Sequence, residues 1–449
     1  MESDVSIVAF DLEGKSGELT RGVGGRPMPI SFDRWSWYLF LFGVALQTST
    51  AATSVLTAGA ILWCLRHRQE CLLACANRSV RPIVLAIGLF CAAILLGVAV
   101  ALANAFSPWL MLVKHLPFLF FFLVLGLFQT PERRLALLLG FSLGAALALL
   151  TSLFSAAMDT PILSGNPDDF NTFRKHIEHN IFLGLAALFL AEGLLIRSRP
   201  DRWEWLGWLV FWLATFDILH LVQGRTGQIV FALVLAWVIG HALRRKRWLV
   251  AALTIVVTVV SVLPGSFGHK SALESGIEMA QRDVSTYQEG RAKTSVAYRL
   301  DFAKTSWQLV RERPLVGYGT GAFVPAYAEY VKLHDPVQEP THNPHNDYLF
   351  YWIESGLPGL VAVIALYAVS LIGAWRIGGL RGTCLAALVL AWAISGLANS
   401  MLLDHPTSFA FVALLAALAS GPLPFGERTV LASANQEAAG NEVTKLRSP

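Results

Sequence analysis

The chain alternates between long apolar runs and short Arg-rich segments, with one long polar stretch in its second half. Runs such as Ile83 to Leu102 and Leu135 to Leu153 approach or reach the roughly 20 residues that a helix needs to cross a bilayer core. Leu, Ala, Val and Phe dominate these runs and do not alternate with polar residues, which favours helices over strands. The pattern therefore predicts an all-α polytopic membrane protein.

About twelve membrane spans are predicted. Their ranges are 35–50, 51–65, 82–104, 109–128, 135–156, 179–196, 203–222, 226–243, 248–265, 356–375, 382–400 and 406–421. Every second connection is basic, at 66–81, 133–134, 197–202, 244–247 and 376–381. Because cytoplasmic loops carry the excess of Lys and Arg, these connections and both termini are predicted to be cytoplasmic.

The orientation divides the chain into five segments. They are a cytoplasmic tail (1–34), nine spans (35–265), a periplasmic loop (266–346), three spans (347–421) and a second cytoplasmic tail (422–449). The loop is too long for a plain connection, so it is expected to carry the chemistry.

Composition excludes several classes of protein. Of the 449 residues 55% are hydrophobic and 15% are charged, against about 25% charged in soluble domains. None of the five cysteines lies in the polar loop, so no disulfide framework is expected. The chain has neither a Gly-x-x-x-x-Gly-Lys phosphate loop nor a dinucleotide fingerprint. Neither a nucleotide nor a nucleic acid is therefore expected as a partner.

Two short helices are predicted inside the loop. Apolar side chains recur at helical spacing at Val296, Leu300, Ala303, Trp307 and Val310. Pro314 ends this helix, and a flexible turn at 317–321 leads to a second helix over 323–332.

Arg225 is the first candidate functional residue, within Gln223-Gly224-Arg225-Thr226-Gly227 between two spans. An Arg at the edge of the hydrocarbon is costly and often functional, although it can also extend along a helix end to reach water. The two flanking glycines are expected to leave room for a large ligand.

Arg299 is the second candidate, with Arg291 and Lys293 shortly before it. An Arg fork binds phosphate through two hydrogen bonds. Arg299 lies beside the apolar stripe and is expected to point toward the membrane. The alternative is a surface charge on a solvated helix.

His345 is the third candidate, directly before a span on the predicted outer side. Its imidazole can exchange protons near neutral pH. Alternatively, His345 packs or caps the following helix, where Asn346 and Asp347 are themselves good N-caps. His342 lies close by, but a metal site needs three or more ligands, and none is predicted.

The order of these motifs resembles the O-antigen ligase and polymerase superfamily of bacterial inner membranes. The pieces that carry the resemblance are Gly-Arg-Thr-Gly around Arg225, Tyr-Arg-Leu around Arg299, Arg313 to Gly319 with Phe323 and Tyr327, Pro344 to Leu349, and Glu354 to Gly359. The ordered series covers roughly 220–360, and the form His-Asn-x-x-Leu at His345 is similar to the ligase branch.

The resemblance implies a GT-C-like glycosyltransferase that needs no metal, cofactor or nucleotide. It implies a glycan on undecaprenyl diphosphate as donor and a sugar hydroxyl of lipid A–core as acceptor. Residues matching Arg225 and Arg299 would hold the diphosphate, and His345 would be the general base. Supporting candidates are Arg291, Tyr318, His342, Asn346 and Tyr348, the tyrosines as rings against sugar or polyprenyl.

Two other functions stay open. An O-antigen polymerase would use the same donor but a second undecaprenyl-linked glycan as acceptor. A transporter of lipid-linked sugar would need ionisable groups near the middle of the bilayer. The charges here cluster at the predicted outer rim, with Asp217 and His220 as the nearest exceptions, so an enzyme of the inner membrane with a periplasmic active site is favoured.

Overall fold

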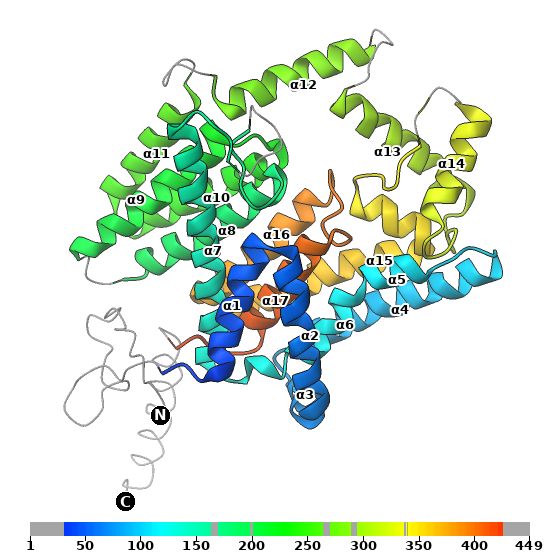
Figure 1. Ribbon diagram of the computed structural model, residues 1–449, viewed down its shortest axis with the longest axis horizontal. Coiled ribbons are helices and arrows are strands. Elements are labelled where there is room, and N and C mark those ends of the chain that lie inside the picture. Colours follow the sequence, from blue (N-terminus) through cyan, green and yellow to red (C-terminus); the bar gives the residue numbers. More distant parts are fainter. Residues whose placement is uncertain are drawn as a thin grey trace, which may run out of the picture.

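The computed structural model describes residues 31–162, 169–197, 201–263, 270–288, 294–335, 338 and 340–424, and these residues form helices and no strand (Figure 1). Most of both predicted tails, together with Arg291, lies outside the described residues. The prediction of an all-α chain is confirmed for the residues described.

The helices follow the predicted apolar runs closely. In chain order they are α1 (Arg34–Thr48), α2 (Thr50–Arg66), α3 (Arg68–Ala76), α4 (Arg81–Ala103), α5 (Trp109–Lys114), α6 (Leu116–Val124), the 3₁₀ turn η1 (Leu127–Gln129), α7 (Pro131–Ala157), α8 (His176–Leu195), α9 (Arg202–Phe216), the π-helical turn η2 (Asp217–Leu221), α10 (Arg225–Arg244), α11 (Trp248–Val262), α12 (Ala272–Gln288), α13 (Ser295–Glu312), α14 (Phe323–His334), α15 (Asp347–Ile377), α16 (Gly379–Ser395) and α17 (His405–Ala419).

Five of the described helices are long and apolar enough to cross a membrane by length and composition, namely α4, α7, α8, α10 and α15. The segments α2, α5–α6, α11, α16 and α17 are apolar but shorter. These helices indicate a multi-pass membrane protein, while the number of twelve spans and the loop's periplasmic side stay predictions.

The predicted span 109–128 is two short helices rather than one. The helix α5 ends at Lys114, and α6 begins at Leu116 with Pro117 in its first turn. Pro117 has no N–H to donate to a carbonyl four residues earlier, and its ring would crowd that carbonyl. The chain therefore breaks at His115.

The tenth predicted span begins nine residues earlier than expected, because α15 starts at Asp347 and is kinked at Gly356, just before Pro358. The turn 317–321 docks onto this kink and is not the loose connection predicted. The N–H groups of Tyr318 and Gly319 donate to Ile353 O (2.8 Å) and Glu354 O (2.9 Å) in α15.

The last helix, α17, lies at the centre of the molecule. Every residue from Thr407 to Ala419 is buried, and α17 contacts α1, α6, α7 and α16. The core of the bundle is thus built around a helix whose sequence differs little from that of the outer spans.

Within the residues that the structure describes, the long loop contains three helices instead of the two predicted. The additional helix, α12, crosses from the α9–α11 group to the α13–α14 group at the top of Figure 1. The bounds of α13 and α14 agree with prediction, and the residues of the apolar stripe on α13 are mostly not the ones that pack inside the protein. Leu300 and Trp307 are 40% and 47% exposed, whereas Ala297 and Leu309 are buried. Periodicity identified an apolar face, but packing on α14 and α15 covers a different one.

Candidate active site

Arg225 begins α10 directly after a tight turn that packs against α8. Gly224 has a φ of +142°, and Asn180 Nδ2 donates to the carbonyl of Gln223 (3.3 Å). A Cβ on Gly224 or Gly227 would lie only 2.8 or 2.4 Å from atoms of Asn180. The prediction that these glycines leave room for a ligand is therefore wrong, because Asn180 fills the space and the glycines allow the two helices to pack closely.

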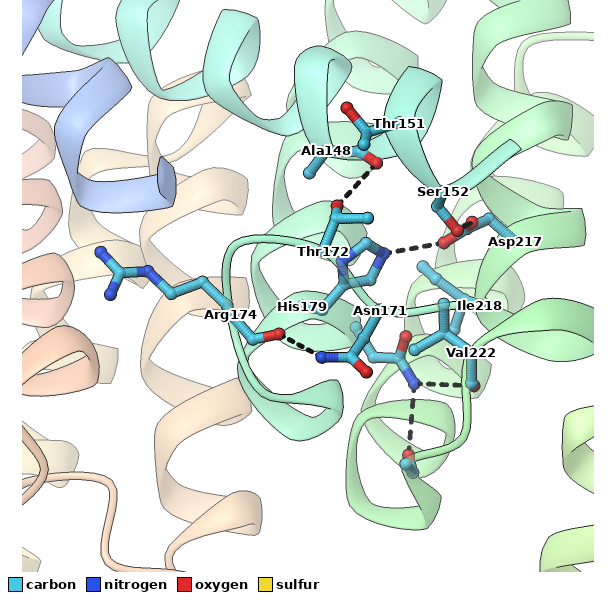
Figure 2. A network of polar contacts seen from close by, with 12 residues as sticks. Ala148, Thr151, Ser152, Asn171, Thr172, Arg174, His179, Asp217, Ile218 and Val222 are labelled. Atoms are coloured by element: carbon cyan, nitrogen blue, oxygen red, sulfur yellow. Dashed lines mark hydrogen bonds and ion pairs between the residues drawn. The ribbon is translucent and has the colours of Figure 1, made fainter. Parts of the chain in front are cut away.

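A buried polar network stands just before this turn (Figure 2). Asp217, in η2, accepts hydrogen bonds from His179 Nε2 (2.9 Å) and from the hydroxyl of Ser152. All three side chains are fully buried. The network joins α7, α8 and η2 and so fixes the segment that leads into Arg225. Such π-helical turns are frequent at functional sites.

The segment before α8 brings Lys175 close to the turn that precedes Arg225. The carboxylate of Asp169 accepts from the N–H of Gln223 (3.3 Å) and lies 3.4 Å from His176 Nδ1. The buried guanidinium of Arg174 donates to carbonyls at the end of α1 over 2.8 and 3.1 Å. Lys175, between Arg174 and His176 in the chain, is exposed and precedes the first turn of α8.

Two helix N-termini thus meet beside Arg225. The carbonyl of His176, in the first turn of α8, would lie 3.1 Å from a Cβ on Gly224, which precedes α10. The N-terminal end of a helix carries partial positive charge. Lys175 and Arg225 add positive charge at these ends, and the carboxylate of Asp169 offsets part of it.

His345 lies in a turn that holds it in an unusual backbone conformation. Its φ is +51°, and its N–H donates to Asn343 Oδ1 (2.6 Å). Its half-buried ring stacks on Phe302 of α13, with the centroids 6.1 Å apart. Asn346 caps α15 by accepting the N–H of Leu349 (3.0 Å). Because Asn346 caps the helix, a capping role for His345 is ruled out.

The connection between α16 and α17, residues 396–404, links this turn to α10. Ser400 donates to Asn343 Oδ1 (2.7 Å), and Asn399 donates to the hydroxyl of Thr226 (3.1 Å), next to Arg225. The sequence prediction had placed these residues in a span over 382–400, but α16 ends at Ser395. The polar pair Asn399-Ser400 within an apolar run was the signal that could have revealed the connection.

Arg299 lies on α13 and is half-buried. Burial lowers the pKa of Arg299, and the positive charge of Arg225 lowers it further. The carboxylate of Asp283 opposes this change. Burial, followed by the charges of Arg299 and Lys175, lowers the pKa of His345. These influences require proximity, so the fold brings Arg225, Arg299 and His345 together with Lys175, which the sequence had not singled out.

The hydroxyls of the two tyrosine candidates, Tyr318 and Tyr348, form hydrogen bonds within the protein. Tyr318 donates to the carboxylate of Glu312 (2.5 Å), and the guanidinium carbon of Arg313 lies 4.7 Å from its ring centroid. These three residues line a cavity of about 280 Å³ between α13 and α14. Tyr348 donates to Ala393 O (2.8 Å) in α16. Both hydroxyls thus have partners within the protein, and stacking of the two rings on sugar or polyprenyl stays a prediction.

His342 is exposed in the same turn as His345. Within the part of the chain that the structure describes, no three or more His, Cys, Asp or Glu side chains are grouped so that they could hold a metal ion.

This arrangement defines a class: a multi-pass helical membrane protein with a cationic site beside a histidine, assembled from loops and helix ends. Residues 209–364 match the family described as O-Antigen ligase, a stretch that includes Arg225, Arg299 and His345. The predicted resemblance to the O-antigen ligase family is therefore confirmed for this part of the chain. The match supports an enzyme of the membrane glycosyltransferase-like ligase and polymerase type.

An uncharacterized protein of Haemophilus influenzae is similar to part of the chain. It is 26% identical over 121 residues, which are 26% of this chain and 29% of that protein. The matched stretch thus spans less than a third of that relative.

Proposed function

We propose that this protein is an O-antigen ligase of the bacterial inner membrane with its active site on the periplasmic face. It would transfer a glycan from undecaprenyl diphosphate to a sugar hydroxyl of lipid A–core. The observation that carries the proposal is the convergence of Arg225, Arg299 and His345, from three separate segments, within the region that matches the family.

The proposed step is a single displacement. The oxygen of the acceptor hydroxyl attacks the anomeric carbon of the donor sugar, and its proton passes to the imidazole of His345. The bond from the anomeric carbon to the phosphate oxygen breaks, and undecaprenyl diphosphate leaves with the electron pair. Attack opposite the leaving group inverts the anomeric centre.

Arg225 and Arg299 are proposed to hold the diphosphate. Negative charge grows on the leaving group in the transition state, and fixed cations in a site with little water stabilise that charge strongly. Guanidinium forks match phosphate oxygens in pairs. Lys175 and the N-terminal ends of α8 and α10 would add further positive charge.

His345 suits the role of base because burial and nearby cations lower its pKa. A base must be neutral before it accepts a proton, and a lower pKa keeps the imidazole neutral at neutral pH. The bound diphosphate would then offset the cations and favour the protonated imidazole that forms during transfer.

The test is reconstitution of the purified chain in lipid with undecaprenyl-diphosphate glycan and lipid A–core, without ATP. Because fixed cations are proposed to stabilise the leaving group, we expect ligated product in the presence of EDTA. Loss of product on chelation, restored by one divalent ion, would refute the proposed role of the arginines. Longer glycans on undecaprenyl diphosphate, formed without lipid A–core, would identify a polymerase, and movement of donor across vesicles without transfer would identify a transporter.

A further inference from the structure

The helix α12 lies across the side chain of Arg225. A Cβ on Gly276 would come within 3.2 Å of Arg225 Cγ, and the carboxylate of Asp283 lies 3.9 Å from Arg225 Nη1. Gly276 and Asp283 are seven residues apart and therefore share one face of α12. This face covers the arginine, and the side chain of Asp283 is only 14% exposed.

Asp283 is placed where a negative charge is needed. The positive charge of Arg225 lowers the pKa of Arg299, whereas the carboxylate of Asp283 raises it. A guanidinium group that lies near another cation is stabilised by an anion beside it. With no donor bound, Asp283 is such an anion.

The ion pair between Arg225 and Asp283 is also weak enough for another anion to replace the carboxylate. At 3.9 Å the pair is longer than a charge-assisted hydrogen bond, and partly exposed ion pairs of this kind contribute little. A lipid diphosphate brings several negative charges and more acceptor oxygens to the same two arginines. Its charges would repel a carboxylate that stayed in place.

We propose that Asp283 occupies the place of a donor phosphate in the donor-free protein, and that the lipid diphosphate displaces it and with it α12. This inference rests on the proposed function, because it assumes that Arg225 and Arg299 bind the diphosphate. Asp283 is thus a residue that competes with the donor and sets its affinity. Displacement of α12 would open the site to a large lipid-linked glycan.

The test compares Asp283→Asn with wild type in nanodiscs, with undecaprenyl diphosphate as the probe and binding followed by tryptophan fluorescence. Removal of the competing charge should tighten binding about two- to fivefold. Asp283→Glu should bind as wild type does. Glu278→Gln is the matched control, since it removes the same charge from the exposed side of α12, where Glu278 pairs with Lys270 (2.6 Å). Thermal unfolding midpoints close to wild type show that the variants are folded.

Hydrogen exchange of the α12 amides tests displacement directly. Donor should speed exchange in wild type, and Asp283→Asn should exchange fast without donor. Equal or weaker binding by Asp283→Asn, or slower exchange of α12 on donor addition, would overturn the proposal while leaving the proposed function intact. A wild-type protein that does not bind the diphosphate, or an Arg225→Ala variant that binds it equally well, would overturn both.

Discussion

Replacement of His345 by Asn separates a catalytic role from a structural one. The residue has a φ of +51°, a conformation that Asn adopts more readily than most residues. The hydrogen bond to Asn343 comes from the backbone N–H, so it survives the change. The substitution therefore removes the imidazole with little disturbance of the turn.

The expected magnitudes differ enough to decide the question. Loss of the stacked contact with Phe302 costs about 0.5–1.5 kcal/mol, and the easier backbone conformation of Asn offsets part of that cost. We expect the free energy of unfolding to change by less than about 1 kcal/mol. Removal of a general base should slow turnover about a hundred- to ten-thousandfold, which corresponds to roughly 3–5 kcal/mol in the activation free energy.

The assay is ligation by the reconstituted variant, together with binding of the lipid-linked donor. Donor binding should stay close to wild type, because the base acts on the acceptor. His345→Ala serves as a second variant with the same expected loss of turnover. Near-normal ligation by His345→Asn in a folded protein would rule out His345 as the base. Attention would then pass to exposed His342, since the carboxylate of Asp347 is fully buried against the N–H of Leu402.

Three further outcomes are expected. Arg299→Ala should weaken donor binding and turnover together, while Arg299→Lys should restore only part of either, because a point charge cannot bind phosphate through a fork; full activity of the Lys variant would contradict the fork. Lys175→Gln should raise the pKa of the His345 imidazole by removing a positive charge. The acidic limb of the pH profile of kcat/KM should therefore move to higher pH. An unmoved limb would show that Lys175 does not act on His345. A Cys at exposed Asp335 should be labelled from the periplasm and a Cys at Arg245 should not; cytoplasmic labelling at Asp335 would reverse the topology and the proposed side of the active site.

Local sequence determined most of the helices. The spans predicted over 226–243 and 248–265 are α10 (Arg225–Arg244) and α11 (Trp248–Val262), and α13 ends at Glu312, just before Pro314. A helix forms its backbone hydrogen bonds within one segment, so an apolar run and its end signals are enough to locate it. The motifs around Arg225, Arg299 and His345 were likewise visible as short ordered pieces.

Only the tertiary structure decided which faces are covered and which turns meet. It showed that the glycines beside Arg225 serve packing against Asn180, and that α13 buries a face other than its predicted stripe. It also brought Lys175 close to His345 and Asp283 close to the arginines, although neither residue belongs to a local motif. The physical reason is that burial and charge at a site depend on neighbours from distant segments. Periodicity along one helix records that a face is apolar, but it cannot record which neighbour covers that face.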